Sequence, residues 1–163
     1  MSSSTDDPRS IMESTLFTFL SHQAFKRNDD PSLPVSMVSP ECLWYVKPET
    51  FITNYPFVGG VKTTAEQKEH MGREMVIMEE SRSKILDSAI DTVARKGTAR
   101  VEHWMKYTGS EPSSMEICWF VNFTDDGKKV SQVVKFIDTA EGAKVIEEMS
   151  KGGYKMEEES SQV

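Results

Sequence analysis

Apolar side chains recur along the chain with two periods, a helical period near both ends and a strand-like period between them. A first helix is predicted to begin at Asp7-Pro8, an N-cap residue followed by proline in the first turn. The segment Asn28–Pro31 is expected to stop the helical pattern. The inward face of this first helix keeps the three- and four-residue spacing of a helix: Ile11, Met12, Thr15, Leu16, Phe19, Leu20 and Gln23.

Two further helices are predicted from their capping patterns. One opens at Thr64, where Gln67 three residues later completes a capping box. The other opens at Asp138 and ends near Gly152-Gly153. Three methionines share one face of the Thr64 helix and predict either core packing or a soft cavity wall: Met71, Met75 and Met78.

Between these helices the pattern predicts strands and one long irregular segment. The segment covers residues 28–60 and contains a short apolar stretch, Cys42–Val46, that fits a strand. Connections of this length are often functional lids or walls. Because the strands follow one another and the helices stand apart from them, the order indicates an α+β fold with a mostly antiparallel sheet. The other four strands are predicted at Ile85–Thr92, Arg100–Tyr107, Met115–Phe123 and Val130–Ile137.

The third and fourth of these strands are predicted to form a hairpin with a defined register. Asp125-Asp126-Gly127 fits a three-residue loop with glycine in the left-handed conformation, which sets Thr124 opposite Lys128. The pairs that follow are Phe123 with Lys129, Val121 with Ser131, Trp119 with Val133, and Ile117 with Lys135.

This register predicts that Lys135 lies on the core face of its strand. Side chains alternate between the two faces of a strand, and every second residue from Met115 to Phe123 is apolar. An ammonium group buried without a partner is costly, so Lys135 is expected to reach water in a cavity or to have an acidic partner. The opposite face mixes polar and sizeable apolar groups, as interfaces do: Glu116, Cys118, Phe120, Asn122, Gln132, Val134 and Phe136.

Length and composition limit the chain to one globular domain. Its 163 residues, 37% hydrophobic and 28% charged, are typical of a single folded domain. We expect this domain at residues 7–153, between disordered tails at 1–6 and 154–163, the second of them acidic. Nineteen basic against 26 acidic residues give a net charge of −7, which argues against a nucleic-acid partner. The longest apolar run, Ile117–Val121, is far too short for a membrane span.

The cysteines and histidines predict neither a disulfide framework nor a metal site. Cys42 and Cys118 are too few for a framework and indicate a reducing, cytoplasmic location. The first residues lack the basic end and apolar stretch of a secretory signal, so none is expected. His22, His70 and His103 do not have metal-ligand spacing, and the first two are expected on helix surfaces.

Three segments, with the order of the elements, resemble a known superfamily: Pro40–Pro48, Trp119–Lys129 and Val134–Asp138. They are similar to the nuclear transport factor 2-like superfamily, and most to the SnoaL-like cyclases and isomerases of fungal secondary metabolism. The resemblance implies a cone-shaped α+β domain in which a curved sheet wraps around three helices and encloses a deep apolar cavity. It also implies a homodimer through the outer face of the sheet, and catalysis without a metal or redox cofactor.

The resemblance and the position of Lys135 together predict an enzyme. The expected activity is that of a cofactor-independent isomerase, cyclase or dehydratase-type lyase, acting on a hydrophobic polyketide- or terpenoid-like intermediate. The alternative is a non-catalytic carrier of a small ligand, or a dimeric interaction module of the same fold, because a fold does not determine a function. Ionisable residues that converge on one cavity would favour the enzyme.

Three ionisable residues are candidate catalytic groups. A desolvated Lys135 can act as a base, or as a cation that stabilises an oxyanion, although its head can also reach the rim of the sheet. His103 lies on the more apolar face of its strand and suits proton transfer, unless it is a core histidine bonded to backbone. Asp87 shares a predicted face with Ile85 and can orient His103 or pair with Lys135, but exposure is the alternative.

Seven further residues are candidate substrate contacts. Tyr45 and Tyr55 flank the irregular segment and can donate hydrogen bonds into a cavity, or pack as aromatic side chains. Trp119 can stack on an unsaturated substrate. The remaining candidates are apolar or aromatic residues of the predicted inward faces: Ile117, Met105, Tyr107 and Met75.

Overall fold

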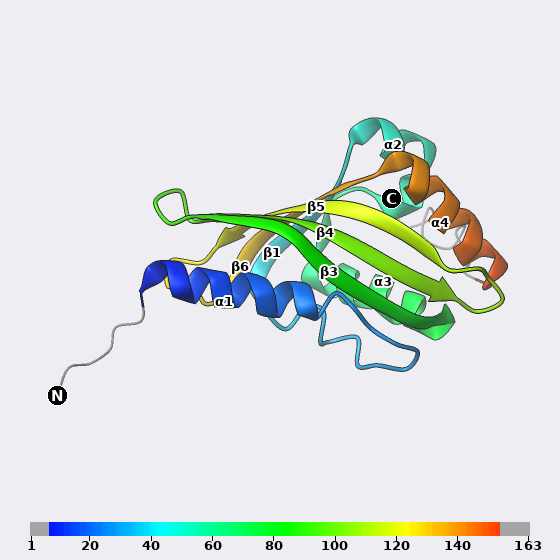
Figure 1. Cartoon of the computed structure of the whole chain (residues 1–163), viewed down its shortest axis with the longest axis horizontal. Coiled ribbons are helices and arrows are strands. Elements are labelled where there is room, and N and C mark those ends of the chain that lie inside the picture. Colours follow the sequence, from blue (N-terminus) through cyan, green and yellow to red (C-terminus); the bar gives the residue numbers. More distant parts are fainter. Residues whose placement is uncertain (1–6, 154–163) are drawn as a thin grey trace.

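The computed structural model describes residues 7–153, and the predicted tails at 1–6 and 154–163 lie outside the described residues. Within residues 7–153, four α-helices pack against one six-stranded sheet (Figure 1). In chain order the elements are α1 (Pro8–Ser21), β1 (Val38–Lys47), α2 (Glu49–Asn54), the 3-10 turn η1 (Pro56–Val58), β2 (Lys62–Thr63), α3 (Thr64–Ile77), β3 (Met78–Asp91), β4 (Lys96–Tyr107), β5 (Ser113–Phe123), β6 (Val130–Ile137) and α4 (Thr139–Lys151).

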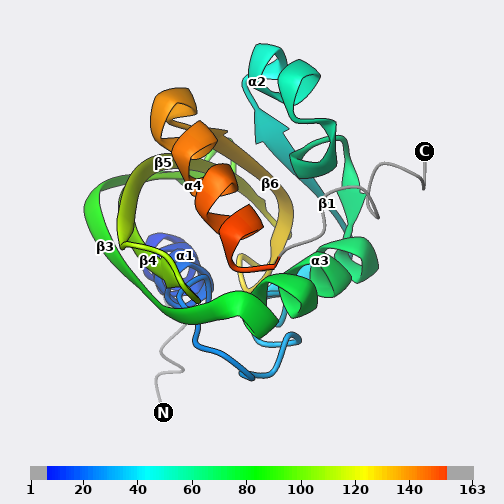
Figure 2. The same ribbon diagram turned by 90° about the vertical axis from the view of Figure 1, so that its right-hand side faces the viewer.

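The sheet is mixed and strongly curved. Its strand order is β2-β1-β6-β5-β4-β3, and among these described strands the pair β1–β6 is parallel while the other neighbours are antiparallel. Figure 2 shows strands β3 to β6 curving around α1 and α4, with α3 across the open side between β3 and β1. The predicted α+β class with a mostly antiparallel sheet is confirmed. The three predicted helices are α1, α3 and α4, and the short α2 is additional.

Helix α1 forms as its sequence predicts. The Asp7 carboxylate caps it by accepting from the Ser10 backbone N–H, and Pro8 occupies the first turn. Helical residues end at Ser21, after which Gln23 stays buried and donates to the Phe19 and Pro34 carbonyl oxygens. The buried face of the helix packs into the core with Met12, Thr15, Leu16, Phe19 and Leu20.

Helix α3 and the strand after it differ from the prediction at both ends. The capping box is formed one residue earlier, with Thr63 as the N-cap and Glu66 as its partner. The helix ends at Ile77, so Met78 begins β3, seven residues before the predicted start at Ile85. The segment between them is mostly charged and polar, so no apolar alternation marks it as a strand. Pairing with β4 along nearly the whole strand, from Met78 opposite Tyr107, holds it extended.

The β5–β6 hairpin has the predicted faces but not the predicted register. Gly127 takes the left-handed conformation, with φ 72°, but the loop closes through Thr124 N–H and the Lys129 carbonyl rather than at Lys128. A bulge beside Asn122 adds a second residue of offset, which leaves Trp119 opposite Lys135. A slip of two residues returns each side chain to its original face, so Lys135 still lies on the inner side.

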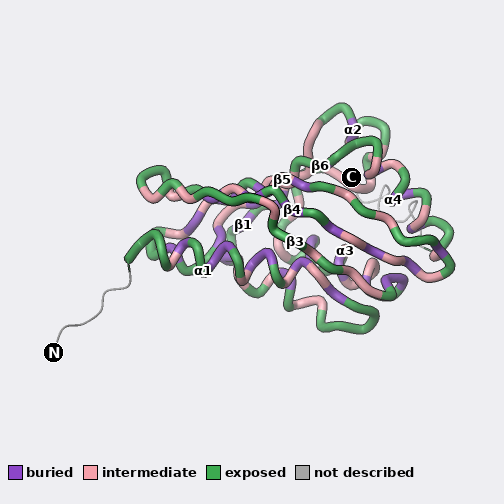
Figure 3. Tube along the Cα trace, in the orientation of Figure 1, coloured by how far each residue is buried: buried purple, intermediate pink, exposed green. Residues whose placement is uncertain are grey.

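The inner face of the sheet and the helices bury two neighbouring apolar clusters. Along β4 and β5 buried residues alternate with more exposed ones (Figure 3). One cluster joins α1 to the inner faces of β4, β5 and β6, and the other joins α3, α4 and the ends of β3 and β4. The Asp138 carboxylate caps α4 by accepting from the backbone N–H groups of Ala140 and Glu141. Gly142 lets α4 approach Phe51 of α2 closely, since an added Cβ would lie 3.2 Å from the Phe51 side chain.

Candidate active site

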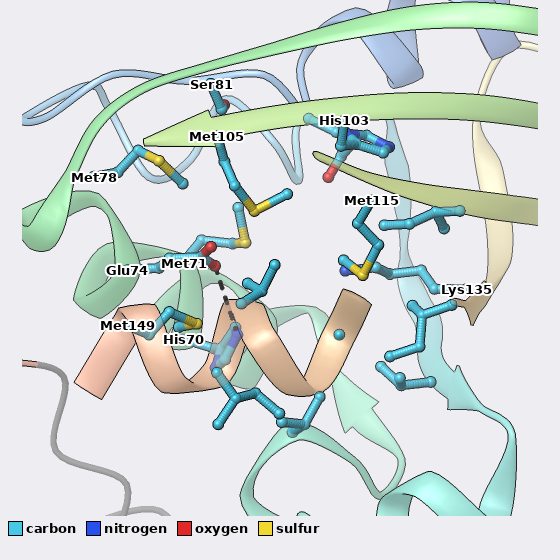
Figure 4. Close-up of a pocket in the computed structure, with 18 of the residues that line it drawn as sticks. His70, Met71, Glu74, Met78, Ser81, His103, Met105, Met115, Lys135 and Met149 are labelled. Carbon is cyan, nitrogen blue, oxygen red and sulfur yellow. Dashed lines mark ion pairs between the residues drawn. The ribbon is translucent and has the colours of Figure 1, made fainter. Parts of the chain in front are cut away.

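A cavity of about 130 Å³ lies where the two apolar clusters meet (Figure 4). A volume near 150 Å³ holds a benzene-sized molecule. Inner-face residues of β4, β5 and β6 line one side of the cavity, and residues of α3 and α4 line the other. Methionines, whose thioether side chains are flexible, make up much of the wall: Met71, Met78, Met105, Met115 and Met149.

Lys135 reaches this cavity from β6 (Figure 4). It stands opposite Trp119 of β5, and its Nζ lies 5.2 Å from the centre of the indole ring. Within residues 7–153 it makes no hydrogen bond and no ion pair. Desolvation lowers the pKa of Lys135, the negative charge of Glu74 acts in the opposite direction, and the positive charge of Lys62 lowers it further. The sequence predicts that the Lys135 ammonium either reaches a cavity or has an acidic partner. In the structure it reaches a cavity.

His103 lies in the cavity wall as a neutral ring. It comes from β4 and is 6% exposed. Burial, with the nearby charge of Lys135, lowers the pKa of His103 to about 3. The Trp119 indole N–H donates to His103 Nε2 at 3.1 Å. Because an indole nitrogen can only donate, Nε2 accepts, and the single proton of the neutral ring is on Nδ1.

A histidine–carboxylate pair on α3 completes the polar lining. His70 and Glu74 are four residues apart on the helix, with His70 Nε2 3.8 Å from Glu74 Oε2 (Figure 4). The Tyr107 hydroxyl donates to Glu74 Oε1 at 2.6 Å. Both side chains of the pair are 16% exposed. The hydrogen bond from Tyr107 of β4 holds the Glu74 carboxylate in place.

The sequence interpretation missed this pair and placed His70 on the surface. The helical spacing contained the signal, because Glu74 follows Met71 by three residues and precedes Met78 by four. A carboxylate on the same face as buried methionines has to be hydrogen-bonded or to border a cavity. In the structure both conditions hold.

Several predicted substrate contacts do line the cavity. Trp119, Ile117, Met105 and Tyr107 all have side chains in its wall. Met75 is buried in the cluster around α3 but is not among the lining residues. The structure therefore assigns Met75 to packing.

Asp87 lies outside the cavity, and the prediction that it could orient His103 or pair with Lys135 is wrong. A bulge between Ile85 and Asp87 interrupts the alternation of β3. Ile85 still stands opposite the buried Val101, but Asp87 stands opposite Arg100 and is exposed. The bulge reverses the faces of all residues that follow it.

Tyr45 and Tyr55 also lie away from the cavity wall. Tyr45 pairs with Val134 on the outer side of the sheet, whereas its neighbour Trp44 is buried on the inner side. Tyr55 packs between aromatic rings, with centroid separations of 4.8 Å to Phe51 and 6.4 Å to Phe57. Tyr55 therefore follows the aromatic-packing alternative, whereas Tyr45 lies on the outer side of the sheet, and neither residue lines the cavity.

The described residues offer no metal site, and Cys42 is not a reactive thiol. Within residues 7–153, no three His, Cys, Asp or Glu side chains are grouped so that they could hold a metal ion. Burial raises the pKa of the Cys42 thiol to about 12, which makes it a poor nucleophile at neutral pH.

No helix in the described part of the chain is both long and apolar enough to span a membrane.

The buried neutral His103 predicts acid sensitivity of the fold. Its pKa is about 3 in the folded protein against an ordinary value of 6.5, so between these values the unfolded chain binds a proton that the folded protein does not. Stability is therefore present above pH 6.5 and is lost as the pH falls, by at most about 1.4 kcal/mol for each pH unit from this residue. Urea unfolding of the wild type and of His103→Gln at several pH values measures it. An equal pH dependence in both proteins would contradict the prediction.

Comparison with solved structures identifies the fold. The BvnE pinacolase from Penicillium brevicompactum has a TM-score of 0.77 at 14% identity, over 92% of this chain and 98% of its own. PrhC from Penicillium brasilianum has a TM-score of 0.72 at 18% identity, over 89% and 91%. A nuclear transport factor 2-like protein of unknown function from Burkholderia pseudomallei has a TM-score of 0.62 at 12% identity, over 83% and 97%.

The chain has the nuclear transport factor 2-like fold that its sequence motifs predict. At these identities the similarity establishes the fold alone. No protein-family model matches the sequence, and no curated protein matches it.

Proposed function

We propose that the chain is a cofactor-independent enzyme that moves protons next to a carbonyl group of a hydrophobic small molecule. Such a step can serve isomerisation, ring closure through an enol, or loss of water beside a carbonyl group. A polyketide- or terpenoid-like intermediate is the expected substrate. The observation that carries the proposal is the convergence of Lys135, His103 and the His70–Glu74 pair on one apolar cavity. The similarity of fold to a fungal pinacolase agrees with it.

In this proposal each polar group has a separate task. The methionine-rich wall binds the apolar body of the substrate and excludes water. Lys135 activates the carbonyl group, since it is the cation of the cavity wall without a paired carboxylate among the described residues. Glu74, held by Tyr107, accepts and returns the proton, with His70 beside it. Neutral His103 is a poor base. Its Nε2 accepts from Trp119, so its Nδ1–H is the group that can donate to an oxygen of the substrate.

Proton exchange on a small ketone tests the proposal without knowledge of the natural substrate. Cyclohexanone is close to the cavity in size, and its α-protons exchange slowly in neutral heavy water. Proton NMR is expected to show faster loss of these signals with the wild-type protein than with heat-denatured protein. If the ketone binds but its α-protons exchange no faster than in buffer, the chain is a ligand carrier, which is the alternative for this fold.

The proposal includes a homodimer formed through the outer face of the sheet. Tyr45, Val134 and Phe120 form a row across β1, β6 and β5, and Phe120 is 46% exposed. Phe136, which is 48% exposed, extends this apolar surface. Such a face suits an interface because it combines aromatic and polar groups.

Sedimentation of the wild type is expected to give a dimer, and Phe120→Asp is expected to shift it toward monomer. An unpaired carboxylate at the centre of an interface is costly to desolvate. Phe17→Asp is the matched control, because Phe17 is an exposed phenylalanine on α1, away from this face. A wild-type monomer at micromolar concentration would rule out this interface.

A further inference from the structure

We infer that Lys135 is a nucleophilic amine that binds the carbonyl carbon of the substrate covalently, as a Schiff base. This inference rests on the proposed carbonyl chemistry in the same cavity. It specifies the substrate class, namely aldehydes and ketones with an acidic hydrogen beside the carbonyl group. The sequence predicts Lys135 as a base or as a charged oxyanion site, and neither of these roles forms a covalent bond to the substrate.

The surroundings of Lys135 are those of a reactive lysine rather than a structural one. Its Nζ has no hydrogen-bond or ion-pair partner within residues 7–153 and faces the ring of Trp119. A lysine desolvated in an apolar pocket releases its proton more easily and becomes a nucleophile. The lowered pKa of Lys135 agrees with this geometry.

The charged groups around the cavity do not form an ion pair with Lys135. Glu74 and His70 of α3 and His103 of β4 line the same cavity, and Lys62 of β2 adds a positive charge. Glu74 is bonded to the Tyr107 hydroxyl and lies beside His70, so it is not paired with the lysine. The carboxylate is therefore available for proton transfer while the amine is available for attack.

The covalent step balances with water as its one small product. The lone pair of the Lys135 amine forms a C–N bond to the carbonyl carbon, and the nitrogen proton moves to the oxygen to give a carbinolamine. One proton from the His70–Glu74 pair then releases the hydroxyl group as water and leaves a C=N iminium ion. The iminium ion acidifies the neighbouring C–H bond, and Glu74 removes that proton to give an enamine. Reprotonation and hydrolysis by water restore the amine.

Pentane-2,4-dione is a suitable probe, because it is small enough for the cavity and its Schiff base rearranges to a stable enaminone that absorbs in the near ultraviolet. The full chain, incubated with this diketone at neutral pH, is expected to gain the mass of one diketone less one water. Peptide mapping is expected to place the adduct on Lys135. The reaction should be faster than at exposed lysines, because a lysine whose pKa is lowered by desolvation carries more free amine at neutral pH.

Three variants make the test specific. Lys135→Met and Lys135→Arg are both expected to lose the adduct, because arginine keeps the charge but cannot form a Schiff base. Lys84→Met is the matched control and should keep it, since Lys84 is an exposed lysine of β3. Thermal unfolding confirms that each variant is folded. Labelling of the wild type spread equally over exposed lysines, or absent from Lys135, would overturn the inference.

The cyclohexanone exchange assay separates this inference from the proposed function. If Lys135→Arg still exchanges the α-protons of cyclohexanone, the covalent route is wrong while the proposed function stands. If wild-type Lys135 forms the enaminone but cyclohexanone is not exchanged, the amine is reactive and the proposed proton transfer is wrong.

Discussion

Replacing Lys135 with methionine is expected to lower the rate of cyclohexanone exchange about a hundredfold or more. Electrostatic stabilisation of a developing oxyanion contributes on the order of 3 kcal/mol, which is about a hundredfold in rate, and a covalent iminium ion would add to this loss. Methionine keeps the apolar stem of the lysine and removes the amine. The exchange rate of the variant, measured by NMR beside that of the wild type, gives the factor directly.

The same substitution is expected to keep or raise the melting temperature. Lys135 has no ion-pair partner within residues 7–153, so its ammonium bears a desolvation cost that an apolar side chain does not. Opposite effects on rate and stability distinguish a functional residue from a packed one. A folded Lys135→Met protein that exchanges protons at the wild-type rate would reduce Lys135 to a strand residue.

Much of this site could be predicted from the sequence, because an error of two residues in strand register leaves each side chain on the same face of the sheet. The hairpin loop is longer than predicted and a bulge follows it, and together they move Lys135 from Ile117 to Trp119 as its partner. The inner position of Lys135 survives, since a shift of two residues preserves the face. The single bulge before Asp87 has the opposite effect and places that carboxylate outside.

The part of the site on α3 was not predictable by the rule applied to its histidine. The sequence predicts a surface position for His70, because a lone histidine on a polar helix is usually exposed. Its environment depends on where β4 and α4 pack against α3, and that is set by tertiary contacts. The polar residues that follow Met78 likewise hide a strand that pairing with β4 creates.

Glu74→Gln is expected to reduce the exchange rate by about 10² to 10⁴, the usual effect of losing a general base. Glutamine has nearly the shape of glutamate, and its amide oxygen can still accept from the Tyr107 hydroxyl, so the wall of the cavity should be preserved. It cannot accept a proton at neutral pH. The exchange rate should therefore fall while the melting temperature changes little.

Helix α3 offers a matched control for this prediction in Glu69→Gln. Glu69 is on the same helix, but its side chain is 61% exposed and pairs with Arg73 at 3.1 Å. An exposed pair of this kind contributes little to stability, so Glu69→Gln should exchange protons at the wild-type rate. If Glu74→Gln does the same, the His70–Glu74 pair is structural, and the proton must move through the Lys135 amine. In that case exchange would still be lost in Lys135→Met, and the two variants together would identify the base.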